Sequence, residues 1–284
     1  AVRPLKDGVI ADFDAAEEML KMFIQKSNEG RGIIAPRLVI GIPSGVTSVE
    51  RRAVREAGLA GAREVHLIDE PVAAAIGASL PVTEPIGTMI VDIGGGTTEV
   101  AVLSLGGTVL SESVRVAGDE INDSIATYLK KVHNLVVGER TAEDIKIKIG
   151  SAFPNDDFDK TSIEVRGLHL LSGLPRCINL TSGEIREAMT DPLNKIVEAV
   201  KRTLERTPPE LAADIVDRGI MLAGGGALVR GVSDLLSHET GIFTHIAENP
   251  LLCVVNGCGE VLDDFKKLKR VVDTPDFARN AVRD

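Results

Sequence analysis

A run of three glycines between an apolar strand and two threonines is the segment best suited to chemistry in this sequence. Residues 91–98 read VDIGGGTT. Glycine lets a turn adopt positive φ and lets phosphate oxygens approach main-chain amides closely, and threonine hydroxyls add further donors. Asp92 at the strand end can hold Mg²⁺ through water, since Mg²⁺ keeps several waters and takes few carboxylates, or it can simply cap the turn. We predict a phosphate-binding turn here.

A second glycine cluster follows about 130 residues later, at 224–226. A buried strand is expected at 219–222 before it and a helix near 231–239 after it. A nucleoside can lie against such bare backbone, although tight packing of a helix on a strand also requires glycine. The first cluster matches neither the Walker pattern nor GxGxxG, because a hairpin and not a helix follows it. Together the two clusters predict a nucleotide between two domains.

The elements that must position these turns begin as repeated strand–helix units. A short apolar run at 37–42 leads through Pro-Ser-Gly to a capping box at 47–50, which predicts a helix N-terminus. A second strand at 64–68 leads into an alanine-rich helix at 70–80 with proline in its first turn. An amphipathic helix at 14–28 precedes both units. Two tandem units of this kind predict α/β architecture.

From about residue 85 the pattern changes to a β-meander, which we interpret as the start of a second domain. Strands are expected at 88–91, 99–103 and 108–116, the last two joined by a glycine pair. Further predicted elements are helices at 118–133 and 141–150, strands near 162–166 and 176–180, a capping box at 181–184 that opens a helix to about 204 with a kink or break at Pro192, and a helix near 257–269.

The composition is that of an acidic protein with an aliphatic core. The 284 residues include 42 acidic and 32 basic side chains, which gives a net charge of -10. This balance argues against a nucleic-acid-binding surface, because neutralising phosphates needs clustered Lys and Arg. The cysteines, Cys177, Cys253 and Cys258, form no CxxC pair, and we expect all three to be buried apolar residues. The five histidines show no metal-type spacing. No apolar run approaches the roughly 20 residues that span a bilayer.

Several runs together resemble the MreB-type bacterial actins. They are 37–45 (RLVIGIPSG), 68–77 (IDEPVAAAIG) and the turns after Asp92 and at Gly224, in the order seen in that family, and the opening 2–12 is similar as well. The resemblance covers essentially the whole chain and the combination is highly specific. It implies an α/β, actin-like two-domain fold, of the kind shared by actin, hexokinase and heat-shock ATPases, with a nucleotide cleft and an incomplete first domain.

The resemblance also implies a domain division. Residues 1–84 would be the remainder of actin-like domain I, 85–250 domain II with a smaller inserted subdomain at about 117–190, and 251–284 a C-terminal segment that returns to domain I. The family's first phosphate loop, an Asp-Leu-Gly-Thr type segment, is not found here, since the nearest candidate at 12–14 lacks the glycine. We therefore expect this chain to bind nucleotide weakly or not at all and assign ATP hydrolysis to the complete protein.

The implied function is that of an ATPase that polymerises into filaments and determines rod cell shape by organising cell-wall synthesis. Its location would be cytoplasmic, peripheral to the cytoplasmic membrane. ATP or ADP and Mg²⁺ are the implied cofactors. The implied partners are further copies of the chain, the inner face of the membrane, and membrane proteins of cell shape and wall synthesis, but not nucleic acid. A heat-shock-type chaperone ATPase, with a C-terminal β-rich substrate domain, and an actin-fold sugar or acid kinase, with a substrate-binding carboxylate, are the alternatives.

The resemblance assigns roles to individual residues. Glu70 matches the family's water-positioning carboxylate and Thr97 helps to align that water, although a carboxylate at a helix N-terminus is favourable without any catalytic role. Asp92 would hold Mg²⁺ through water. The implied nucleotide-binding residues are Gly94, Gly95, Gly96 and Thr97 at the phosphates, Glu143, Asp144, Ile145 and Lys146 beside the ribose and adenine, and Gly224, Gly225, Gly226 and Ala227 along the base. Without the family, Glu143 and Lys146 would be interpreted as a surface i, i+3 ion pair.

The segment 31–37, RGIIAPR, places two β-branched apolar residues between basic ones in an expected loop. Ile33 and Ile34 are therefore predicted to form a membrane-inserting tip. The resemblance associates a hydrophobic loop at the matching place with membrane binding. The alternative is that both residues begin the following strand and pack inside.

Overall fold

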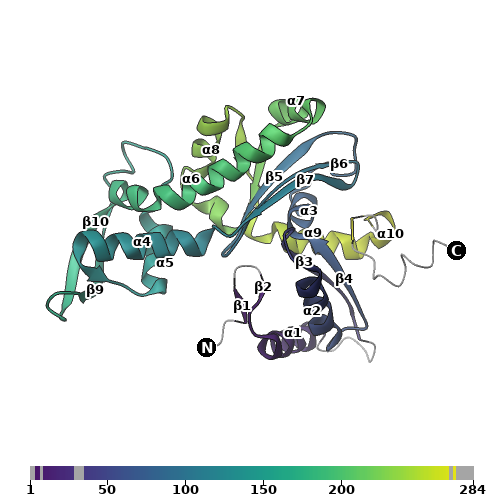
Figure 1. Ribbon diagram of the computed structural model, residues 1–284, viewed down its shortest axis with the longest axis horizontal. Helices are drawn as coiled ribbons and strands as arrows, with labels where there is room; N and C mark the ends of the chain where they lie inside the picture. Colours follow the sequence, from purple (N-terminus) through teal and green to yellow (C-terminus); the bar gives the residue numbers. More distant parts are fainter. Residues whose placement is uncertain (1–3, 7–8, 29–34, 269–270, 273–284) are drawn as a thin grey trace.

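A five-stranded sheet lies at the centre of the molecule. The computed structural model describes residues 4–6, 9–28, 35–268 and 271–272. The sheet has the strand order β12-β11-β5-β6-β7, in which β5, β11 and β12 are parallel to one another and β6 and β7 form an antiparallel meander. Figure 1 shows α6, α7 and α8 on one side of this sheet and α3 and α9 on the other, with β9 and β10 at the end far from α10.

The bounds of the elements are as follows. The strands are β1 (Leu5–Lys6), β2 (Val9–Ile10), β3 (Arg37–Ile42), β4 (Glu64–Asp69), β5 (Thr88–Ile93), β6 (Thr98–Ser104), β7 (Gly107–Val114), β8 (Leu135–Val136), β9 (Ser162–His169), β10 (Pro175–Thr181), β11 (Ile220–Ala223) and β12 (Thr244–Ile246). The helices are α1 (Phe13–Ser27), α2 (Ser48–Leu59), α3 (Glu70–Gly77), α4 (Gly118–His133), α5 (Glu139–Ile149), α6 (Ser182–Arg206), α7 (Pro209–Arg218), α8 (Val232–Thr240), α9 (Cys253–Asp263) and α10 (Phe265–Leu268), with 3₁₀ turns η1 (Gly225–Leu228) and η2 (Pro250–Leu252).

Strand β5 is buried along its whole length because both faces of the sheet are covered. Its alternate residues enter different cores, as the period of two in a strand requires. Met89 and Val91 pack in a core with side chains of α4 and α6, whereas Ile90 packs in a second core with α3 and α9. A strand buried on both faces reads as a continuous apolar run, which explains why 88–91 could be recognised from sequence.

The two strand–helix units predicted near the start of the chain are confirmed. Strands β3 and β4 pair in parallel, and β3 spans the predicted residues. Helix α2 begins at the predicted capping box: the Glu50 amide donates to Thr47 Oγ1 (3.2 Å), and the Thr47 amide donates to Glu50 Oε2 (2.7 Å). These reciprocal bonds satisfy amides that have no partner inside the helix.

Helices α3 and α9 cross with their backbones in contact. A Cβ added at Gly77 would lie 1.9 Å from the Cys253 carbonyl oxygen, and one at Gly257 would lie 1.9 Å from the Ala73 carbonyl oxygen. No side chain fits between the helices at these two positions. Glycine is required here by the close approach of the two backbones and not by a positive φ.

Helix α9 also contacts β3, so the C-terminal part of the chain packs against its N-terminal part. This contact supports the division into 1–84 with 251–284 and 85–250, which we retain as a proposal. We refer to the described residues of the first set as lobe I and to 85–250 as lobe II. The predicted helix near 257–269 is displaced: α9 begins earlier, at Cys253, and α10 follows it as a separate short helix.

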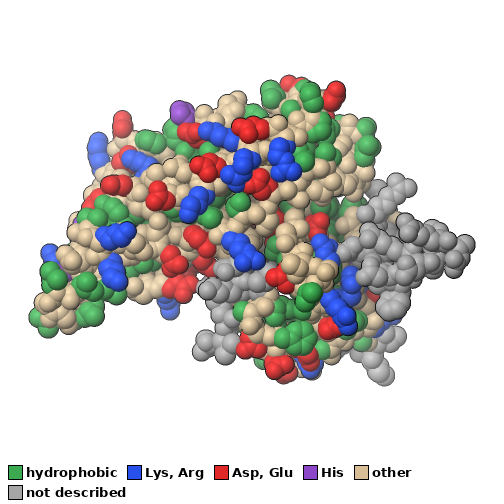
Figure 2. All heavy atoms as spheres, viewed as in Figure 1, with side chains coloured by type: hydrophobic (Ala, Val, Ile, Leu, Met, Phe, Trp, Pro, Cys, Tyr) green, Lys and Arg blue, Asp and Glu red, His purple; other side chains and the backbone are tan. Residues whose placement is uncertain are grey.

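The outer part of lobe II carries a small antiparallel sheet, β10-β9-β8, next to α4, α5 and α6. Helix α6 begins at the second predicted capping box, between Thr181 and Glu184. It continues through Pro192, so of the predicted kink or break the break does not occur. Cys177, expected to be buried, is exposed. The burial prediction was wrong because both faces of β10 meet solvent around this residue. Figure 2 shows hydrophobic side chains at this end of the molecule, where Leu168, Leu170, Leu171 and Leu174 are exposed.

Candidate nucleotide site

The first glycine cluster forms the turn between β5 and β6. Asp92 pairs with Glu99 and Ile93 with Thr98 across this hairpin, and the Gly94 amide donates to the Thr97 carbonyl (2.9 Å). Neither Gly94 nor Gly95 has φ in the left-handed region, so the positive φ that glycine permits is not used at these positions. A Cβ at Gly95 would meet nothing closer than the Asp119 carboxylate, at 3.9 Å. The fold itself therefore does not require glycine at Gly95.

The turn rests on the N-terminus of α4. The Gly118 amide donates to the Gly94 carbonyl (3.1 Å) and the Asp119 amide donates to the Gly95 carbonyl (2.8 Å). With its carbonyls bound in this way, the turn is held by main-chain groups and its exposed side stays open. Thr97 is buried with an exposure of 8%, at the base of the turn.

Lys146 on α5 lies beside this anchored turn. Its Nζ donates to the Gly118 carbonyl (2.9 Å) and would lie 3.3 Å from a Cβ at Gly118. Burial lowers the pKa of the Lys146 ammonium, and the neighbouring charges of Glu143 and Asp119 oppose this shift. The lysine is thus packed against the N-terminus of α4, on which the turn rests, and is not a purely surface group. Glu143 and Asp144 are exposed on the same helix, whereas the side chain of Ile145 is buried in the core.

The second glycine cluster meets the first at the end of β5. Strand β11 pairs in parallel with β5, which places Ala223 beside Asp92. Gly224 has φ +80°, and a Cβ there would lie 2.3 Å from the Ile93 carbonyl oxygen and 2.5 Å from Asp92 Oδ1. A Cβ at Gly226 would lie 2.2 Å from Ile93 Cγ2. Packing alone therefore explains glycine at both positions.

The remaining residues of this cluster differ in exposure. Gly225 is exposed beside Leu251, whose Cδ2 would lie 3.1 Å from an added Cβ. Ala227 is fully buried. A ligand in this region would therefore meet Gly224 and Gly225, while Ala227 supports them from within.

Three carboxylates converge beneath the phosphate-binding turn candidate. Burial raises the pKa of Glu70 to about 8, and the nearby charges of Asp92 and Glu99 add to the shift. Burial and the charge of Glu99 raise the pKa of Asp92 to about 7. Glu70 begins α3, directly after Asp69, whose carboxylate pairs with Arg51 (3.2 Å). Like charges this close make the site receptive to a cation.

Among the described residues, no group of three His, Cys, Asp or Glu side chains is arranged to hold a metal ion by itself. Asp92 is nevertheless a suitable residue for Mg²⁺, because this ion keeps several waters and is usually bound by one or two carboxylates together with substrate phosphates. The repulsion that raises the pKa of Asp92 would be relieved by such an ion. The donor set fits Mg²⁺ in the company of a polyphosphate.

Glu99 was not predicted from the sequence as a site residue. It is 1% exposed within β6, between Thr98 and Val100, and its charge raises the pKa of both Glu70 and Asp92. A single acidic residue in an apolar strand directly after the threonines was the available signal. Ile33 and Ile34 lie outside the described residues.

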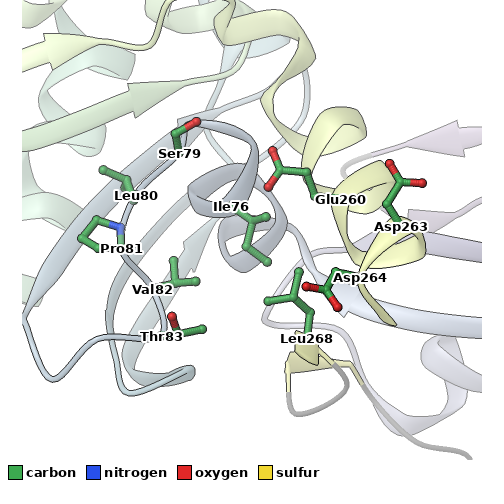
Figure 3. Close-up of a pocket in the computed structure, with 10 residues that line it drawn as sticks. All are labelled: Ile76, Ser79, Leu80, Pro81, Val82, Thr83, Glu260, Asp263, Asp264 and Leu268. Carbon is green, nitrogen blue, oxygen red and sulfur yellow. The ribbon is translucent and has the colours of Figure 1, made fainter. Parts of the chain in front are cut away.

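A cavity of about 400 Å³ lies away from this cluster, at the opposite end of α3 from Glu70. Figure 3 shows Ile76 and the segment from Ser79 to Thr83 on one side of it and Glu260, Asp263 and Leu268 on the other. The glycine turns do not line it. The candidate nucleotide site is therefore defined by the turns and carboxylates and not by this cavity.

The central sheet, with a glycine turn at the end of β5 and a second at the end of β11, defines the class of this protein as actin-like. The family model for the MreB/Mbl protein matches residues 1–270. Cell shape-determining protein Mbl of Bacillus subtilis is 49% identical over 271 residues, which are 95% of this chain and 81% of that protein. Cell shape-determining protein MreB of Escherichia coli K12 is 53% identical over 265 residues, 93% of this chain and 76% of that protein.

A solved relative agrees with these matches. MreB5 of Spiroplasma citri bound to ADP superposes with a TM-score of 0.88 at 38% identity, covering 94% of this chain and 80% of MreB5, and the same protein has also been solved bound to AMPPNP. The chain belongs to the MreB/Mbl family of actin-like, cell shape-determining proteins. The chaperone and sugar-kinase alternatives are not favoured.

Proposed function

We propose that this protein binds ATP with Mg²⁺ in the cleft between its lobes, hydrolyses it, and assembles into membrane-associated filaments that organise cell-wall synthesis. The observation that carries the proposal is the convergence, at the end of β5, of two glycine turns, the buried carboxylates of Asp92 and Glu99, and the partly buried carboxylate of Glu70. The MreB5 structures with ADP and AMPPNP support a nucleotide as the ligand. The roles predicted from sequence for the site residues form part of this proposal.

The phosphates would lie on the open side of the Gly94–Gly96 turn, with Lys146 and Glu143 toward the sugar and base. Glu70 would accept a hydrogen bond from the attacking water, and Thr97 would help to orient that water toward the terminal phosphorus. Phosphoryl transfer asks mainly for such positioning and for charge stabilisation. Bound Mg²⁺, held through water by Asp92, would offset phosphate and carboxylate charge. Glu70 must be ionised to accept from water, so this role would be favoured at higher pH.

Glu70→Ala tests the catalytic part of the proposal in the full-length protein. Phosphate release should fall to near background while binding of a fluorescent ATP analogue stays measurable, because Glu70 orients water and does not hold the nucleotide. Glu210→Ala, which removes an exposed carboxylate on α7, is the matched control and should behave as the parent protein. Unchanged phosphate release in Glu70→Ala would remove Glu70 from the mechanism.

Self-assembly is the second part of the proposal. Family membership supports it, and the exposed leucines of β9 and the turn after it, including Leu171 at 77% exposure, offer an apolar surface to another copy. ATP-dependent light scattering combined with electron microscopy should show filaments. A protein that hydrolyses ATP but stays monomeric at all concentrations would contradict this part alone.

A peripheral position on the inner face of the cytoplasmic membrane is the third part. Met22 and Phe23, near the end of α1, are 60% and 58% exposed, and Ile33 and Ile34 follow shortly afterwards in the sequence. Apolar side chains of this kind next to basic residues favour an interfacial location. Within the described residues no helix is long and apolar enough to cross a bilayer. Liposome co-sedimentation of an Ile33→Ser, Ile34→Ser variant should show reduced binding, and undiminished binding would favour burial of both residues.

A further inference from the structure

Glu99 connects the two lobes through its carboxylate. Oε2 accepts a hydrogen bond from the Ser44 amide (3.1 Å), in the loop between β3 and α2 of lobe I. Oε1 accepts one from the Ser113 hydroxyl (2.6 Å), on β7 of lobe II, directly opposite Glu99 in the register. One buried side chain thus satisfies a main-chain donor of one lobe while it is anchored in the other.

The loop that carries Ser44 approaches the Ser113 side chain of β7. A Cβ at Gly45 would be 3.3 Å from Ser113 Cβ, which is tighter than an ordinary van der Waals contact. The same β3 strand passes Glu70: a Cβ at Gly41 would be 3.3 Å from Glu70 Cγ. The loop and Glu70 therefore belong to one packed unit of lobe I.

On the lobe II side, Glu99 belongs to the phosphate-binding turn candidate. It pairs with Asp92 across the hairpin and lies on β6, two residues after Thr97 of the turn. A displacement of the Ser44 loop from Glu99 would change the separation between Glu70 and this turn.

A buried carboxylate costs free energy that a purely structural contact does not require. Burying an ionised group loses its hydration, and Glu99 adds a third negative charge near Glu70 and Asp92. Burial raises the pKa of Glu99, although the bonds from Ser113 and Ser44 oppose the shift. A neutral residue would pack there without this repulsion.

We propose that Glu99 is a positioning residue for ATP hydrolysis, which holds the Ser44 loop of lobe I against the phosphate hairpin of lobe II and so sets the placement of Glu70. This inference rests on the proposed ATPase function. Glu99 is not assigned contact with the nucleotide or the water. Its effect should fall on the rate of hydrolysis and not on the affinity for ATP.

The charged groups that face Glu70 come from several elements. They are Asp92 on β5, Glu99 on β6 and Asp69 on β4, and the Cys258 thiol of α9 also lies within electrostatic range. Arg51 on α2 pairs with Asp69. Removing the charge of Glu99 should therefore lower the pKa of Glu70, and the alkaline rise of hydrolysis should move to lower pH.

Glu99→Gln and Glu99→Ala separate hydrogen bonding from charge. The glutamine can accept from the Ser44 amide with Oε1 and donate to Ser113 Oγ with Nε2, whereas alanine can do neither. Hydrogen exchange of the Ser44 amide, read in the full-length protein without nucleotide, should accelerate about tenfold or more in Glu99→Ala and stay near the parent rate in Glu99→Gln. Unchanged exchange in the alanine variant would overturn the interlobe contact whatever the ATPase result.

Phosphate release and ATP binding then test the catalytic consequence. Glu99→Ala should slow single-turnover phosphate release by about tenfold or more with ATP affinity within about threefold of the parent, because small misplacements cost rate more than binding. Glu99→Gln should recover most of the rate and shift the pH profile to lower pH. Equal rates in the parent and alanine proteins, or equal losses in both variants without any pH shift, would overturn the positioning role.

A parent protein that binds ATP but never hydrolyses it would refute the proposed ATPase function and with it this role, and the exchange result would then report on the contact alone.

Discussion

The two glycine turns look alike in sequence, yet the physical reason for glycine differs between them. At 224–226 the backbone needs glycine: Gly224 combines φ +80° with a contact that leaves no room for Cβ, and Gly226 lies against Ile93. At Gly95 the backbone has an ordinary φ and open space. A glycine that the fold does not require is better evidence for a ligand than one that it does. The comparison therefore favours the proposed phosphate role for the first turn and a packing role for the second.

The largest effect is expected at Gly224. Its φ of +80° and ψ of 167° lie in a region that is essentially restricted to glycine, and a methyl group would press on the Ile93 carbonyl. Gly224→Ala should lower the free energy of unfolding by about 3 kcal/mol or more, measured by denaturant titration. A loss below about 1 kcal/mol would show that the second turn tolerates side chains and would remove the contrast.

Gly95→Ala should affect ATP affinity and leave stability nearly unchanged, the opposite of Gly224→Ala. The methyl group meets no protein atom within 3.9 Å but lies where phosphate oxygens would approach, so ATP affinity should fall about tenfold, or ~1.4 kcal/mol, with little change in thermal midpoint. Gly107→Ala is the matched control, because its Cβ would also have its nearest neighbour at 3.9 Å and it lies in the next hairpin. Equal ATP affinity in both variants would contradict the phosphate assignment.

The carboxylates between the two turns predict a pH dependence of stability. Glu70 and Asp92 have folded-state pKa values of about 8 and about 7, above their ordinary values, so the folded protein binds more protons than the unfolded chain between about pH 4.5 and 8. Their contribution is complete below this window and is lost as the pH rises through it.

Without nucleotide, stability should therefore fall from pH 6 to pH 8.5, on the order of 1–3 kcal/mol. Glu70→Gln should flatten this slope, and added ATP with Mg²⁺ should also oppose it if the cation binds beside Asp92. Thermal unfolding at a series of pH values measures both effects. If the pH dependence of stability is identical in Glu70→Gln and the parent protein, a group other than Glu70 causes it.

The smallest effect is expected at Gly225, inside the second turn. Its Cβ would approach only Leu251 Cδ2, the end of an exposed and flexible side chain, at 3.1 Å. Gly225→Ala should change stability by less than about 1 kcal/mol, which denaturant titration can compare directly with Gly224→Ala. A loss as large as that of Gly224→Ala would mean that the whole turn, and not its two packed glycines, is intolerant.

Local chemistry made much of the fold predictable. The strand at 37–42 and the capping boxes at 47–50 and 181–184 were recognised because their signals are complete within a few residues. The exposure of Cys177 depends on what lies beside β10, so local patterns misjudged it. The long helix predicted to about 204 is confirmed, although no break occurs at Pro192.

The candidate site likewise contains residues that could be predicted from the sequence and residues that could not. The glycines and Asp92 stand out in the sequence, and the structure brings the two turns together. The role of Glu99 depends on Ser44 and Ser113, which are 55 and 14 residues away along the chain, and no pattern at Glu99 could reveal partners at those separations. The sequence also could not show which glycines the backbone requires, because φ and the space around Cβ are properties of the folded chain.

The crossing of α3 and α9 has a consequence for biosynthesis. The residues in contact, Gly77 with Cys253 and Ala73 with Gly257, are separated by more than half of the chain. A ribosome adds roughly 5–20 residues per second, so α3 would wait on the order of ten seconds or more for α9 to be made. During that interval the small-residue face of α3 remains without its partner, and Glu70 cannot reach its final surroundings. Nascent chains of this protein would thus be candidates for chaperone binding until α9 has left the ribosome.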